Sequence, residues 1–169
     1  MLKRSGPVAL VIAGALLLLG SAGYLLYARA LANPGAAAIP ESIAGMPLSQ
    51  KTVGIEAVAE VTRLHGKEFP LTSGAMATYG EGAATLWVSG TTASPLAAEM
   101  VRAMTDKIAQ GRSPFTATGT RRLNGRNVYE LDGLGQRHFY FQSGNFILWL
   151  AVDDSTAENA LGEVLQFYP

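Results

Sequence analysis

Side chains that could bind a ligand alternate along the stretch GQRHFYFQSGNFILWLA, residues 135–151. His138 and Tyr140 occupy alternate positions of a predicted strand, and Trp149 lies on the next strand. Because successive side chains of a strand point to opposite faces, these three share the face opposite to Phe139 and Phe141. An imidazole among aromatic rings could ligate a haem or a metal, or contact a bound molecule as a polar group.

The hairpin turns that the sequence predicts bring a second tryptophan to the same face. They pair Tyr140 with Trp149, and Met76 with Trp87, across neighbouring strands. If every helix covers the other side of the sheet, this face is left bare, and an exposed apolar patch usually marks an interaction site. The predicted binding residues are Trp87, Trp149, Tyr140, His138 and Met76.

Two alternatives to a binding surface stay open at this point. A helix, or the apolar segment IPESIAGMPL at 39–48, could cover the aromatic face and make it a second small core. A slip of one residue in the strand register would invert the two faces completely.

Other chemistry is sparse. The chain has two histidines and no cysteine, which excludes zinc-thiolate sites, iron–sulfur clusters, disulfides and thiol nucleophiles. No nucleophile-elbow or phosphate-loop motif is present. We therefore expect no catalytic residue, no metal and no resident cofactor, and the protein is predicted not to be an enzyme.

A basic concentration precedes an acidic C-terminal end. Its members form a possible basic patch: Arg121, Arg122, Arg126 and Arg137. A solvated surface is the simpler interpretation. All 13 acidic residues but only 11 of the 13 basic residues follow position 28, so this part carries a net charge of −2. A nucleic-acid partner needs a strong basic excess and is not expected.

The N-terminus predicts where the protein lies. Residues 7–27 carry no charge and span about 31 Å as a helix, which matches a hydrocarbon core of about 30 Å. Lys3 and Arg4 precede this run and only Arg29 closely follows it, so residues 1–6 are predicted to be cytoplasmic. The sequence thus predicts a single-pass signal anchor in the cell membrane, with the C-terminal domain outside the cytoplasm. A cleaved signal peptide is the alternative, because ARA at 28–30 resembles a cleavage site.

The remaining chain predicts one α+β domain. Residues 28–53 are rich in Pro, Ala and Gly and are expected to form a linker. Residues 54–169 show three amphipathic helical patterns and three hairpins. This predicts an antiparallel sheet of about six strands with three helices packed mainly on one face.

Two functions fit these patterns. The first is a non-enzymatic, membrane-anchored binding or assembly module, such as an accessory subunit of a membrane complex, which uses the aromatic face to bind another membrane or periplasmic protein. The second is a small-molecule or cofactor-binding domain, for haem among others, with His138 as the polar contact or ligand.

Overall fold

The computed structural model describes residues 5–111 and 113–169. The chain forms two compact units, Met1–Asn33 and Pro34–Pro169, of which the second is the folded domain. Lys3 and Arg4, on which the expected orientation in the membrane depends, lie outside the described residues.

The first unit is one apolar helix, α1, which spans Ser5–Ala32. Its segment Gly6–Ala32 is long and apolar enough to cross a membrane or to serve as a signal sequence. The helix continues five residues beyond the predicted span because ARALA contains good helix formers. It ends before Pro34, whose ring disfavours helical geometry in the preceding residue.

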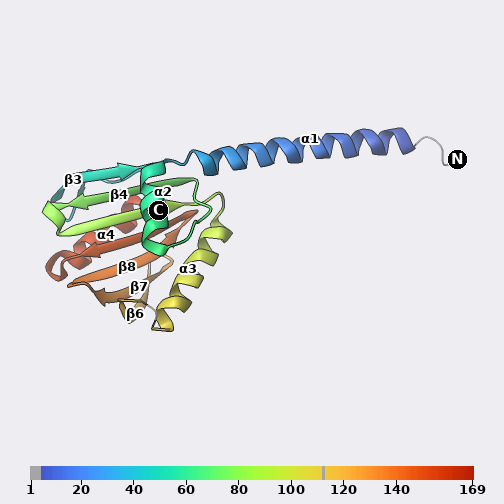
Figure 1. The fold of residues 1–169 in the computed structure, drawn as a ribbon. Helices are drawn as coiled ribbons and strands as arrows, with labels where there is room; N and C mark the ends of the chain where they lie inside the picture. The colour runs from blue at the N-terminus through green and yellow to red at the C-terminus, as the bar shows by residue number, and fades with distance from the viewer. Residues whose placement is uncertain (1–4, 112) are drawn as a thin grey trace. The chain divides into compact units, whose positions relative to one another are not determined.

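The domain is built on one sheet of nine strands, three more than the six expected (Figure 1). Their order is β2-β3-β4-β5-β9-β8-β7-β6, and all neighbours along this path are antiparallel. Strand β1 pairs in parallel with β4. The strands are β1 Gly35–Ala36, β2 Ser42–Ile43, β3 Met46–Val53, β4 Ser73–Tyr79, β5 Ala84–Gly90, β6 Thr116–Leu123, β7 Arg126–Gly133, β8 Gln136–Ser143 and β9 Phe146–Val152.

The extra strands come from the segment that the sequence analysis assigned to a linker. Strands β1, β2 and β3 all lie between residues 35 and 53. Pro47 fits in β3 because that strand lies near the edge of the sheet, where a missing N–H is tolerated. Ile43 is fully buried in the main core, with Met46 and Leu48 packed against it. These few large apolar residues hold the segment to the domain.

The helices cover both faces of the sheet, two on the aromatic face and one on the other, so the aromatic face is not left bare as the predicted binding surface requires. Helix α4, Ala157–Phe167, packs on the face of Phe139 and Phe141. Helix α2, Ile55–His65, lies against β3 and β4 on the opposite face, and α3, Ser94–Ala109, lies against β8 and β9 there. Figure 1 shows α2 and α3 in front of the sheet and α4 behind it. An amphipathic helix needs an apolar surface, and both faces of this sheet supply one.

The larger core lies beneath α4. Phe139, Phe141, Leu148 and Leu150 are fully buried there. Four apolar residues of α4 are buried in this core: Ala157, Leu161, Val164 and Leu165. The core on this face is closed and mainly apolar.

The turns fix the register as the sequence predicts. Asn124 and Gly125 have φ values of 47° and 78°, as a two-residue type I′ turn requires. Tyr140 is opposite Trp149, and Met76 is opposite Trp87. The strand register on which the aromatic face depends is therefore confirmed.

Candidate functional site

An aromatic row crosses five neighbouring strands on the face of α2 and α3. It runs Met76, Trp87, Trp149, Tyr140, Tyr129, each opposite the next in the sheet. Four of its members were predicted. Tyr129 was missed, although extending the register through the turn at 134–135 would have placed it opposite Tyr140.

The rings at one end of the aromatic row are stacked. Tyr129 and Tyr140 lie with centroids 4.6 Å apart and an 8° angle between planes, and Tyr140 and Trp149 lie 5.4 Å apart at 11°. Phe115 tilts against Trp149 with a centroid distance of 4.9 Å. Stacking of this kind stabilises neighbouring strands and makes the three rings one rigid block.

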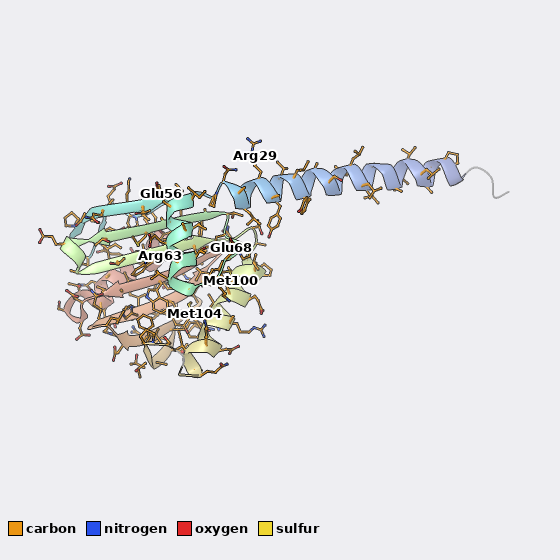
Figure 2. All side chains as sticks on the ribbon, in the orientation of Figure 1. Arg29, Glu56, Arg63, Glu68, Met100 and Met104 are labelled. Carbon is orange, nitrogen blue, oxygen red and sulfur yellow. The ribbon has the colours of Figure 1, made fainter. Side chains whose placement is uncertain are left out.

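Helix α3 covers the middle of the row. Tyr140 is 1% exposed and packs with Ala97 and Val101 of α3. Its hydroxyl lies 3.0 Å from that of Thr105, and burial raises the pKa of Tyr140. Figure 2 labels Met100 and Met104 on the same helix, and both pack against this smaller core. The middle of the expected surface is thus interior packing.

His138 is buried and both of its ring nitrogens are engaged. Trp149 Nε1 donates to His138 Nδ1 at 3.0 Å, and His138 Nε2 lies 2.9 Å from the carbonyl oxygen of Gly133. An indole only donates and a carbonyl only accepts, so the ring is neutral with its proton on Nε2. Burial lowers the pKa of His138, which keeps it neutral. In this arrangement neither nitrogen offers a free lone pair to haem or to a metal.

The two tryptophans differ in their hydrogen bonding. Trp87 is half-buried on β5, and its Nε1 is buried without a hydrogen-bond partner among the described residues. Its cross-strand neighbour Trp149 has His138 as acceptor. A buried donor without an acceptor costs about 1–3 kcal/mol. The Trp87 indole therefore lowers the stability of this face compared with a fully paired side chain.

The aromatic row opens to solvent at Tyr129. One side of this half-buried ring lies against Tyr140, and the ring borders a groove of about 570 Å³ between α3 and the β6–β7 hairpin. We call this the Tyr129 groove. Its polar lining consists of Arg102, Thr105, Asp106, Arg122, Arg126, Asn127 and Gln142. The groove is the place where the predicted aromatic face meets solvent beside cationic and amide groups.

The four arginines of the predicted basic patch lie on two faces of the sheet. Arg121 and Arg137 both pair with Glu130 and Glu158 on the α4 face. A guanidinium held between carboxylates contributes little net positive potential. These two arginines therefore act mainly within the domain.

The other two arginines of the patch border the Tyr129 groove, Arg126 from the α4 face and Arg122 from the opposite face. Arg126 donates to the carbonyl oxygens of Leu165 and Tyr168 at the end of α4. Arg122 is exposed, lies opposite Asn127 and makes no ion pair with a described residue. Arg122 thus carries the positive charge available to a ligand.

No group of three or more potential metal ligands occurs among the described residues. A comparison with protein-family models, curated proteins and solved structures found no match to this chain. The function is therefore inferred from the geometry of the domain alone.

Proposed function

We propose that the protein is a membrane-anchored, non-enzymatic binding module that docks another membrane or extracytoplasmic protein at the Tyr129 groove. In this role it serves as an accessory subunit of a membrane complex. The α1 helix is the anchor, and the domain from Pro34 onward is the docking unit.

The observation that carries this proposal is the open end of the aromatic row. Tyr129 presents a rigid aromatic edge beside the exposed Arg122, and tyrosine and arginine are enriched where interfaces gain most of their binding energy. The groove is open, and its described lining residues form no buried titratable cluster, which favours a protein surface over an enclosed substrate. The fully engaged His138 weakens the alternative of a haem site.

The side of the membrane is tested with single cysteines, because the chain has no cysteine of its own. The exposed Gln166 on α4 is changed to Cys and treated in intact cells with a membrane-impermeant maleimide. We expect labelling without lysis. Labelling only after lysis would place the domain in the cytoplasm and overturn this part of the proposal.

Docking is tested with a photo-crosslinking amino acid at Asn127, which lines the groove, in the full chain in its native membrane. The matched control carries the same amino acid at Lys51, an exposed residue of β3 on the far side of the sheet. We expect a discrete adduct from position 127 and none from position 51. Equal adducts from both positions, or none from either, would contradict a docking role for the groove.

A further inference from the structure

The strand that borders the Tyr129 groove ends the sheet. Strand β6 pairs with β7 on one side, and no strand of the described part of the chain follows it on the other. Most of its side chains are exposed. A long exposed edge offers backbone N–H and C=O groups to any extended chain of suitable sequence.

The hairpin geometry identifies which backbone groups face outward. In a two-residue type I′ turn, the flanking residues Leu123 and Arg126 form a hydrogen-bonded pair. Hydrogen-bonded pairs alternate along an antiparallel ladder, so Arg121 also bonds to β7, while Thr120 and Arg122 point their backbone groups away from it. Among the described residues, no turn or loop hydrogen bond reaches the backbone of these two.

We infer that this edge takes up an extended, acidic segment of a different protein as a tenth strand, paired with Thr120 and Arg122. The inference rests on the proposed docking function and specifies its partner. Main-chain hydrogen bonds supply the affinity in such strand additions, and alternate side chains supply the specificity.

The charge and shape of the edge favour this occupant. Side chains of an added strand that point to the α3 face would lie beside those of Thr120 and Arg122, which share that face with Tyr129 and Asn127. A carboxylate beside Arg122 would meet a guanidinium that has no described ion-pair partner. Two residues away, a large apolar side chain could reach over the small Thr120 to the ring of Tyr129. The edge therefore selects an acidic residue and an apolar residue at alternate positions.

A second copy of this chain fits the edge poorly. A two-fold axis at Arg121 or at Arg122 would put that guanidinium directly opposite its own copy, which is unfavourable. An axis at Thr120 would put Arg122 opposite Thr118, where a bulge interrupts the ladder between Ala117 and Gly119. Each of the three registers is thus penalised, whereas a strand carrying carboxylates is not.

The experiment uses the full chain in lipid nanodiscs and a phage library of random nonapeptides as the probe. We expect enrichment of sequences that alternate Asp or Glu with β-branched or aromatic residues. The best sequence is then synthesised and its binding measured by fluorescence anisotropy.

Two variants at one position isolate the backbone contribution. Thr120→Pro removes an outward N–H without taking a hydrogen bond from β7, and Thr120→Ala keeps that N–H. We expect Thr120→Pro to weaken binding at least about tenfold and Thr120→Ala to change it less than about twofold. Deuterium exchange in the unmodified protein gives an independent reading, because the amides of Thr120 and Arg122 should gain protection when the peptide binds.

Charge reversal tests the chemistry of the partner. Arg122→Glu should weaken binding of the acidic peptide and strengthen binding of the same peptide with Lys in place of its acidic residues. Arg63→Glu, an exposed substitution on α2, should leave the binding of both peptides unchanged. No enriched peptide, no acidic preference, or equal binding to the two Thr120 variants would overturn the inference. A dimer that Thr120→Pro dissociates would assign the edge to a second copy. If the peptide test fails but photo-crosslinking at position 127 gives a specific adduct, the proposed docking function stands. Only the strand addition is then overturned.

Discussion

The two faces of the sheet are formed by the same strands but bury different kinds of side chain. The α4 face is filled mainly by buried aliphatic and phenylalanine side chains, and its two tyrosines, Tyr79 and Tyr168, donate to the carbonyl oxygens of Pro40 and Ala38. The α2 and α3 face carries tyrosines, tryptophans and a histidine that need hydrogen bonds, and part of it remains half-buried. Aliphatic side chains have no polar atoms that need hydrogen bonds. Tyr and Trp combine an apolar ring with a polar group, so they suit surfaces that are partly buried and partly exposed to solvent. The first face mainly stabilises the domain, and the second also has groups left for recognition.

The largest expected effect on stability comes from truncating a buried side chain on the α4 face. Phe141→Ala removes a fully buried ring and should lower the free energy of unfolding by about 3–5 kcal/mol. Urea denaturation of the full chain in detergent, followed by circular dichroism, measures it. A loss below about 1 kcal/mol would mean that this face is as loosely packed as the other one.

A smaller loss of stability is expected when Trp149, whose indole donates a hydrogen bond to His138, is replaced. Trp149→Phe leaves the buried Nδ1 of His138 without its donor, which should cost about 1–3 kcal/mol besides any loss of packing. The pKa of His138 should rise, because the neutral ring loses a hydrogen bond that favours it. Nuclear magnetic resonance of the imidazole follows this pKa, and a pKa unchanged by the substitution would contradict the contact.

The same histidine predicts a pH dependence of stability. Burial lowers the pKa of His138 below its unfolded value of about 6.5, so the unfolded chain binds this proton more tightly. Stability should therefore be full above that value and fall as the pH drops from it toward the folded pKa. His138→Gln should flatten this part of the profile. Identical slopes in the two proteins would show that another group causes the dependence.

The smallest effect is expected at the other indole. Trp87→Phe relieves the cost of a buried N–H that has no described acceptor but also loses packing of the larger ring, so the net change in unfolding free energy should stay within about 1 kcal/mol. Trp87 and Trp149 lie opposite each other on adjacent strands, which makes them a matched pair. Equal losses in the two Trp→Phe variants would mean that ring packing, not hydrogen bonding, sets their contributions.

The sequence predicted the local geometry better than the placement of the helices. Turns determine register directly: the turn at Gly144-Asn145 sets the pairing of Tyr140 with Trp149, and the turn at 80–83 sets that of Met76 with Trp87. The helical stripes of α3 and α4 are also visible in the sequence. Nothing in an amphipathic stripe states which of two apolar sheet faces it will cover, so the covering of Tyr140 by α3 could not be read from it.

Two further features lay outside the reach of sequence patterns. The strands between residues 35 and 53 are short or proline-containing, and edge pairing stabilises them only once β4 is in place. The Tyr129 groove depends on the distance between α3 and a hairpin that contacts it from elsewhere in the chain. Both features arise from tertiary contacts and not from local preference.

The pairing of β5 with β9 has a consequence for folding. Ala84 pairs with Val152, so the seam in the middle of the sheet joins two halves that are far apart along the chain. Each half is a set of neighbouring hairpins, yet neither can bury its inner strand until residues 146–152 have been synthesised. Each half therefore completes the core of the other, and we expect the two halves of the sheet to fold and unfold together.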